Sequence, residues 1–423
     1  MSASRRDARA LAIGSAVSGL LAYLVFALTT RGLGAEQAGP VSVLWSYWAF
    51  AGAAFTFPIQ HWVAHSVTAH GEVSVRRSVP LLSLVILGSS LVLGGLAWLA
   101  REPLFHRSDA WFPVMVAAIT FGSALIGGMR GGLSARGRFV AVAWSLVAEN
   151  GVRCAAAGVL LAAGDRRVVD YGLCLVAGQL VILMWPSALR FGTDGDATGG
   201  PHPFAFLAGA SVSQLIGQVV LTGPPILLAL AGGAPGDVTT LFAALALLRA
   251  PYILALGMVA QLTTWVTQAV VAGDLSALAR MRVRLRLATL VTVALAAGGA
   301  ALLGPFVLTL IFGPDVTLGS FAMALVATGC ALAVTNLVLA VSSLAQGRSS
   351  SVARCWLGSL LAAGIAYVAL TGLPLEDTVI WSFLAAEAMA FALLSVVEAR
   401  APGHAPGVSR RSGAGLGRGQ EDG

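Results

Sequence analysis

The sequence predicts an all-α integral membrane protein, with twelve transmembrane helices forming two six-helix bundles related by a pseudo-twofold axis along the membrane normal. Three observations lead to this prediction. The chain is 57% hydrophobic and only 11% charged, with a mean hydropathy of +0.84, whereas a soluble domain is about 25% charged. Apolar runs of roughly 18 to 25 residues, each long enough to cross a bilayer, recur along the chain. Two similar segments also lie about 210 residues apart.

The repeated segment is a hydrophobic helix that ends at a Gly-Arg pair and is followed by a second hydrophobic helix. The first copy is LSARGRFVAVAWSLVAENGVR, residues 133–153, and the second is SLAQGRSSSVARCWLGSLLAAG, residues 343–364. Their turns fall at Gly137-Arg138 and Gly347-Arg348. Six helices per half would give the halves one orientation, a common transporter plan with the binding site between the halves.

Apolar runs and short polar loops place the twelve helices. We predict them at residues 10–30, 41–64, 79–100, 111–129, 139–163, 168–189, 204–230, 239–263, 286–311, 318–345, 353–372 and 378–398. Prolines inside three of them predict kinks at Pro58, at Pro224-Pro225 and at Pro251. The first apolar run is too long for the core of a signal peptide, so we expect it to be retained as the first helix.

A polar stretch divides these helices into six and six. The segment FGTDGDATGGPHP, residues 191–203, predicts a flexible cytoplasmic linker between an N-terminal bundle, 1–190, and a C-terminal bundle, 204–398. Residues 399–423 are rich in Gly, Pro, Ser and Arg and predict a disordered cytoplasmic tail. No loop is long enough for a catalytic domain, and no cofactor or metal motif occurs, so the sequence does not predict an enzyme.

The basic residues predict the topology. All 26 are arginines; with the N-terminus inside, nineteen of them, including Arg130, fall in inner segments and five in outer loops. Arg153 and Arg249 fall within helices. This asymmetry follows the positive-inside rule. It predicts a multi-pass protein of a bacterial cytoplasmic membrane with both termini in the cytoplasm, rather than a protein that binds nucleic acid.

Four short motifs resemble those of polysaccharide and lipid-linked oligosaccharide flippases of the Wzx type. GLGAEQAGPVSVL, residues 32–44, resembles their first outer loop, and AGDLSALARMRVR, residues 272–284, resembles their central cytoplasmic segment. LIFGPDVTLGSFAM, residues 310–323, resembles the turn into their tenth helix, and LSARGRF with AENGVR resembles their helix 4–5 pair. These flippases belong to the multidrug/oligosaccharidyl-lipid/polysaccharide exporter superfamily, and the resemblance spans about residues 10–398.

The resemblance implies a central cavity that opens alternately to each side of the membrane. The implied cargo is a polyprenyl-diphosphate-linked saccharide, flipped or exported for cell-surface polysaccharide biosynthesis. The implied partners are this substrate, membrane lipids and membrane proteins of polysaccharide assembly, with no nucleic acid. No ATPase motif is present, so a gradient of an ion or of the substrate itself would supply the energy.

Charged residues deep in the predicted helices are the first candidates for a substrate site. They are Glu149, Arg153, Arg249 and Glu387. A charge at mid-bilayer costs roughly 2.5–3.5 kcal/mol on insertion scales, so it faces a cavity or a partner. We expect Arg153 and Arg249 to hold the diphosphate, because guanidinium binds phosphate oxygens in bidentate geometry. Alternatively, Glu149 and Arg153 pair one turn apart, and Arg249 pairs with Glu387 or Glu149.

Polar residues of the seventh helix and one outer arginine complete the candidate set. Ser211, Gln214 and Gln218 form one helical stripe; such amides either bind sugar hydroxyls or join helices together. Arg31 matches an arginine of the family's outer loop, and is either a substrate ligand or an anchor to lipid head groups.

Two other functions stay open. A cation-coupled multidrug antiporter of the same superfamily typically has an acidic residue in its first or seventh helix, whereas residues 10–30 and 204–230 contain none. In an antiporter here, Glu149 or Glu387 would carry the proton. A non-transporting membrane scaffold derived from a flippase is the other possibility, with buried charges that bind nothing.

Overall fold

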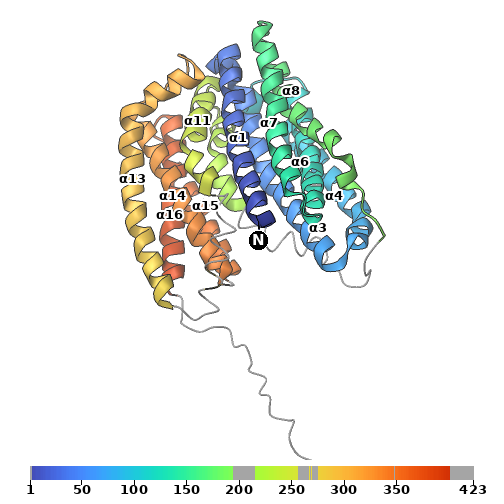
Figure 1. Cartoon of the computed structure of the whole chain (residues 1–423). Helices are drawn as coiled ribbons and strands as arrows, with labels where there is room; N and C mark the ends of the chain where they lie inside the picture. The colour runs from blue at the N-terminus through green and yellow to red at the C-terminus, as the bar shows by residue number, and fades with distance from the viewer. Residues whose placement is uncertain are drawn as a thin grey trace, which may run out of the picture.

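The structure is a computed structural model that describes residues 2–193, 215–255, 266, 268, 275–346 and 348–400. Within these residues all regular secondary structure is helical, and each of the twelve predicted spans contains helix. Eight of the helices described are long and apolar enough to cross a membrane. Figure 1 shows the helices aligned in two groups, with α3, α4, α6, α7 and α8 in one group and α13 to α16 in the other. This arrangement confirms the predicted fold of an all-helical membrane protein built from two bundles.

The N-terminal bundle begins with two helices joined by a single-residue turn. Its elements in order are α1 (Ser2–Leu33), α2 (Ala35–Ala51), the π-helix η1 (Gly52–Thr56), α3 (Phe57–His70), α4 (Glu72–Leu99), α5 (Arg101–Phe105), α6 (Trp111–Ala135), α7 (Phe139–Ala162), α8 (Val168–Ala177) and the 3₁₀ segments η2 (Gly178–Met184) and η3 (Pro186–Leu189). Because α2 starts at Ala35, the first outer connection is shorter than predicted, and the chain from Ala35 to His70 forms one broken helix.

The C-terminal bundle follows the same plan as the N-terminal bundle, and its last helices are long. Its elements are a helix over residues 215–222, α10 (Pro224–Leu230), α11 (Pro235–Leu248), a helix over residues 250–255, α13 (Leu275–Phe312), α14 (Ser320–Ala345), α15 (Ser349–Ala369) and α16 (Leu375–Ala399). We call the end of the molecule that bears the connections at 34, 106–110, 163–167 and 231–234 the outer end, following the predicted topology, and the opposite end the inner end.

The predicted proline kinks are confirmed. The π-helix η1 lies directly before Pro58, a break at Gly223 precedes Pro224-Pro225, and the chain leaves helical geometry at Arg249, two residues before Pro251. Proline removes one backbone donor and its ring collides with the carbonyl of the preceding turn, so each break is the local consequence of the sequence.

The two Gly-Arg turns support the predicted duplication. The N–H of Arg138 donates to the carbonyl of Leu133 over 2.9 Å, and the N–H of Arg348 donates to that of Ser343 over 3.0 Å. Both are the six-residue hydrogen bonds of a Schellman helix end. In the first copy, Gly137 has a φ of +67°, which favours glycine. Equivalent residues therefore end equivalent helices in the two halves.

The predicted end of the fourth transmembrane helix at residue 129 is wrong. Helix α6 continues to Ala135, so Arg130 is a buried helix residue and not part of an inner loop. Glycines let this last part of α6 pack closely against neighbouring segments. A Cβ on Gly131 would lie 2.6 Å from Val63, and one on Gly132 would lie 2.1 Å from the Ala188 carbonyl oxygen. Tertiary contact, rather than helix propensity, carries the helix through this glycine-rich stretch.

Candidate functional site

The two halves meet along α2 and α11 at the outer end. The hydroxyl of Thr239 donates to the carbonyl of Ala35 over 2.7 Å, and the hydroxyls of Ser42 and Thr239 lie 3.4 Å apart. A Cβ on Gly39 would lie 2.6 Å from the Pro235 side chain, so the helices approach closely here. Further hydrogen bonds between the halves join Tyr23 of α1 to Ala246, near the inner end of α11, and Arg31 to the end of α13.

Exposure along the same two helices changes abruptly. Residues 41–46 of α2 and 238–246 of α11 are buried, whereas residues 47–50 and 247–250 are partly exposed. The interface is therefore sealed in its outer half, and its side chains become partly exposed toward the inner end.

Four aromatic rings, the outer aromatic cluster, fill the sealed part: Phe26, Trp45, Phe242 and Phe312. The centroid of the Phe26 ring lies 4.6 Å from that of Phe242, 5.4 Å from that of Phe312 and 5.9 Å from that of Trp45. All four side chains are buried, and they come from both halves. Because such contacts are apolar and close-packed, this cluster would exclude water and ions from the outer end.

Arg249 lies next to this cluster, on the side that faces the inner end. It ends α11, it is partly exposed, and its guanidinium carbon lies 5.6 Å from the centroid of the Phe242 ring. No carboxylate among the described residues forms a salt bridge with it. Neither ion pair considered for Arg249, with Glu387 or with Glu149, occurs in the structure. Tyr23 of α1, whose hydroxyl donates to the carbonyl of Ala246, stands next to the end of α11.

The pairing of Glu149 with Arg153 does occur, and a third charge joins it. Nη2 of Arg153 donates to Oε1 of Glu149 over 2.7 Å, and Nη2 of Arg130 donates to Oε2 over 2.6 Å. All three side chains are buried, and Arg153 is 0% exposed. With two arginines and one glutamate, this buried triad carries a net charge of +1. The exposure of Arg153 shows that it has no free surface for a ligand in this conformation.

Contacts within α7 and with α2, α8 and η2 hold Arg153 in place. Its Nε donates to the Leu175 carbonyl over 3.1 Å, its Nη1 donates to Asn150 over 2.9 Å, and Trp48 covers it with its ring centroid 4.3 Å from the guanidinium carbon. A Cβ on Gly178 would lie 2.3 Å from Nε, so glycine makes room for the arginine. On its other side, Trp48 continues to Trp45, with centroids 5.9 Å apart. The triad thus supports the inner side of the outer aromatic cluster.

Glu387 occupies a separate polar site in the C-terminal bundle. Its Oε2 accepts a hydrogen bond from Nδ2 of Asn336 over 2.7 Å, while Oε1 of Glu387 and Oδ1 of Asn336 are buried with no hydrogen-bond partner among the described residues. Nearby, Nε2 of Gln218 donates to the Tyr252 hydroxyl over 3.3 Å, and Glu387 and Tyr252 line the same small pocket. Two buried acceptors without donors mark a place where a proton or a small cation would be stabilised.

Arg31 joins the halves at the outer end. Its Nε donates to the carbonyl of Ile311 over 3.1 Å and its Nη2 to that of Leu310 over 2.5 Å. These carbonyls end α13, where a cation also interacts favourably with the helix dipole. In this conformation Arg31 is therefore a contact between the bundles at the sealed end.

We predict that Arg31→Ala weakens closure of the outer end, because two charge-assisted hydrogen bonds are lost. The measure is the rate at which a membrane-impermeant maleimide, added outside, labels Ser42→Cys, a position that is buried here. The rate is expected to rise about three- to tenfold on removal of Arg31. The matched control is Arg101→Ala, since the contacts of Arg101 with described residues all lie within its own bundle. An unchanged rate would contradict the role of Arg31.

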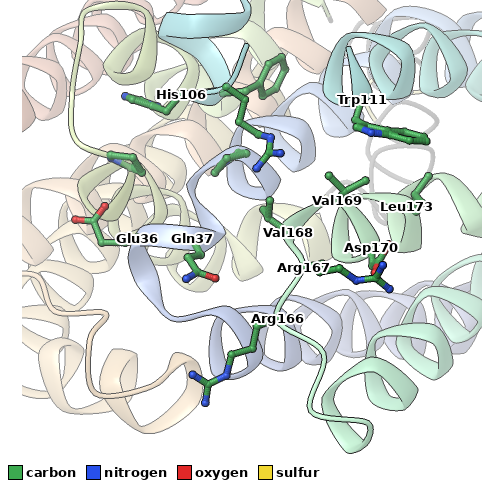
Figure 2. A pocket seen from close by; sticks show the side chains of 14 residues that line it. Glu36, Gln37, His106, Trp111, Arg166, Arg167, Val168, Val169, Asp170 and Leu173 are labelled. Atoms are coloured by element: carbon green, nitrogen blue, oxygen red, sulfur yellow. The ribbon is translucent and has the colours of Figure 1, made fainter. Parts of the chain in front are cut away.

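A cavity of about 650 Å³ lies at the outer end, and Figure 2 shows the side chains around it, Glu36, Gln37, His106, Trp111, Arg166 and Asp170 among them. Its charges are largely compensated locally: Arg167 pairs with Asp165 at 3.1 Å and with Asp170 at 2.5 Å. The hydrogen bond from Arg167 lowers the pKa of Asp165 below its usual range. Pro235 supplies a wall from the other half. The cavity lies outside the sealed interface.

The predicted site residues therefore do not form a single site. Arg249 lies at the open part of the interface, Glu149 and Arg153 in the triad, Gln218 and Glu387 in the C-terminal bundle, and Arg31 at the outer end; Gln214 lies outside the described residues. Sequence reasoning missed Arg130, Tyr23 and Trp48. A charged residue within GGMRGG was a usable signal for Arg130, because the glycines could have been taken as helix-packing residues.

Comparison with known proteins identifies solved structures that share this fold. No family model and no curated protein matches the chain. Among solved structures, an inward-facing multidrug resistance MATE family transporter of the MOP superfamily matches with a TM-score of 0.67 and 16% identity, over 92% of this chain and 98% of that one. The lipid II flippase MurJ in an inward closed conformation matches with a TM-score of 0.65 and 12% identity, over 92% and 87%.

An outward-facing structure shares the fold as well. An outward-facing MATE transporter of the same superfamily matches with a TM-score of 0.55 at 16% identity, over 93% of this chain and 94% of that one, lower than the inward-facing structure. The chain has the fold of MOP-superfamily transporters, in a conformation sealed at the outer end. At these identities the likeness defines the fold alone.

Proposed function

We propose that the protein is a transporter that flips or exports a polyprenyl-diphosphate-linked saccharide across a bacterial cytoplasmic membrane by alternating access, for cell-surface polysaccharide biosynthesis. The observation that carries the proposal is Arg249. It is a partly exposed cation without a carboxylate partner in the described residues, at the point where the interface between the halves opens. A lipid II flippase shares the fold.

In the proposed cycle, the head group enters from the inner end while the prenyl tail stays in the lipid. Arg249 binds the diphosphate, because a guanidinium donates two parallel hydrogen bonds to phosphate oxygens and an apolar surrounding strengthens them. Tyr23 and Trp48 would border the sugar. Separation of α2 from α11 would then open the outer end, moving Trp48 and exposing Arg153 as the second cation, and release the head group outside.

We predict that Arg249→Ala lowers flipping at least tenfold, because the diphosphate loses its charged ligand. The assay reconstitutes the protein in liposomes with a polyprenyl-diphosphate oligosaccharide and scores access of an impermeant external reagent to the head group. Arg101→Ala is the matched control. Equal movement in the wild type and in Arg249→Ala would support a flippase in which Arg249 is not a substrate ligand. Absence of movement under any ion gradient would contradict the flippase.

A cation-coupled multidrug antiporter is the second candidate, and the unpartnered oxygen of Glu387 beside Asn336 favours it. A carboxylate there could bind and release a proton or a small cation during transport. Drug efflux from proteoliposomes that depends on a cation gradient, and that Glu387→Gln abolishes, would support this function. Absence of both flipping and efflux would favour the remaining possibility, a non-transporting scaffold.

A further inference from the structure

A second cavity lies at the inner end, between α15 and α16, away from the interface of the two halves. It has a volume of about 470 Å³ and is lined by Arg348, Arg354 and Arg400, together with Ser351, Cys355, Leu393 and Val397. None of the described residues that line it is acidic. Three arginines around one cavity without a carboxylate produce a positive potential that attracts an anion.

The arginines are only weakly engaged by the protein. Arg348 donates one hydrogen bond, from Nη1 to the Val397 carbonyl over 2.8 Å, and Arg354 makes only long contacts within its own helix, to the Ser350 carbonyl over 3.4 Å and to the Ser351 hydroxyl over 3.3 Å. No salt bridge of the described residues involves Arg348, Arg354 or Arg400. Most of their N–H donors are thus available to a ligand.

Two residues before the Gly-Arg turn's arginine in the other half, a different arginine is paired with an acid. There, Nη2 of Arg136 lies 2.9 Å from Oε1 of Glu72, and the same arginine donates to the carbonyls of Ser187, Ala188 and Arg190. Arg138, the repeat counterpart of Arg348, forms no salt bridge among the described residues either.

Helix α15 places Arg354 at the inner end of a lipid-facing stripe. Leu357, Leu361 and Ile365 follow it at helical spacing, and they are 56%, 66% and 62% exposed. Side chains three or four residues apart share one helix face. In a membrane protein such an exposed apolar face contacts acyl chains, so Arg354 lies at the depth of the lipid head groups.

Helix α16 has the same arrangement in the opposite direction. Met389, Leu393 and Val396 lead to Arg400 on one face, and Met389 and Val396 are 40% and 44% exposed. The two helices thus offer apolar surface along the membrane and arginines at its inner boundary. This is the pattern of a phospholipid site, in which basic residues near the helix ends bind the phosphate and the chains lie along the helices.

We propose that this cavity binds the phosphate head group of an anionic phospholipid of the inner leaflet, with its acyl chains along α15 and α16. The site is independent of the proposed transport function, because its residues do not reach the interface between the halves. Bound lipid would join the inner ends of α15 and α16, which Arg348 already connects through the Val397 carbonyl.

The test uses the full chain, purified and delipidated in detergent. Native mass spectrometry counts bound lipid, and thermal unfolding is followed with added cardiolipin, added phosphatidylethanolamine or inorganic pyrophosphate. We expect cardiolipin to bind and stabilise the wild type more than phosphatidylethanolamine does. Each arginine removed should weaken cardiolipin binding about fivefold, so the triple Arg348→Gln, Arg354→Gln, Arg400→Gln variant should lose roughly 100-fold.

Two further variants keep the test decisive. Arg354→Gln alone removes only contacts within α15, so it should fold and still bind more weakly; replacing all three arginines by lysine should retain much of the binding. Arg101→Gln, at the outer end, is the matched control. The proposal is overturned if cardiolipin binds the triple variant as tightly as the wild type, if pyrophosphate competes as well as cardiolipin, or if both lipids stabilise equally.

Discussion

A disulfide between Ser42→Cys and Thr239→Cys is expected to abolish transport, and reduction is expected to restore it. The two hydroxyl oxygens lie 3.4 Å apart across the sealed interface, with one residue in each half. Cysteines at these positions would place two thiols in close contact across the interface, as a disulfide requires. Because alternating access needs α2 to separate from α11, the cross-link would hold the outer end closed throughout the cycle.

The measurement is flipping in proteoliposomes before and after oxidation, in a background where Cys154, Cys174, Cys330 and Cys355 are replaced by alanine. The matched control is a disulfide within one half, Thr289→Cys with Thr335→Cys, whose hydroxyl oxygens lie 2.9 Å apart between α13 and α14. That cross-link is expected to leave transport unchanged. Transport at the wild-type rate through a fully oxidised 42–239 disulfide would show that the halves do not separate there.

Glu149→Gln is expected to destabilise the protein severely, by about 3–5 kcal/mol, because it leaves Arg130 and Arg153 buried without a carboxylate. The measurement is thermal unfolding of the purified protein in detergent, together with its yield. Glu102→Gln is the matched control: Glu102 is exposed and lies 3.8 Å from Arg101, so its loss is expected to cost about 1 kcal/mol or less. Equal stability of the two variants would contradict the triad.

A triple variant separates the structural role of the triad from a role in binding. Replacing Arg130, Glu149 and Arg153 together by methionine removes all three charges, and a buried ion pair exchanged for apolar side chains is often neutral in stability. We expect this variant to be more stable than Glu149→Gln. If it folds and still flips substrate at the wild-type rate, the triad is structural and Arg153 is no ligand; if it folds and fails to transport, at least one of the three charges acts in transport.

Much of the architecture followed from the sequence because the bilayer restricts what a chain can do. A backbone in lipid must satisfy its own hydrogen bonds, so apolar runs predict helices directly. The arginine asymmetry predicts their alternation, and the prolines at positions 58, 224, 225 and 251 predict the breaks at the places where the structure has them. The Gly-Arg pairs predict equivalent turns because each ends its helix through local backbone hydrogen bonds.

The partners of the buried charges were decided by tertiary structure alone. Periodicity within one helix indicates that Glu149 and Arg153 share a face, and that pair exists. It cannot indicate that Arg130, on α6, turns toward the same carboxylate, or that Trp48, on α2, covers Arg153. For the same reason Arg249 appeared equivalent to Arg153 in the sequence, yet one is partly exposed and the other is completely buried.

The sequence alone therefore determined that this protein crosses the membrane as two bundles of helices, because hydropathy, charge asymmetry and turn residues act locally. Only the tertiary structure decided which arginines are neutralised and which remain available, because that depends on how helices from distant parts of the chain pack. Arg136 meets Glu72, whereas Arg348 and Arg354 form no salt bridge among the described residues. The position of a carboxylate on a neighbouring helix makes this difference.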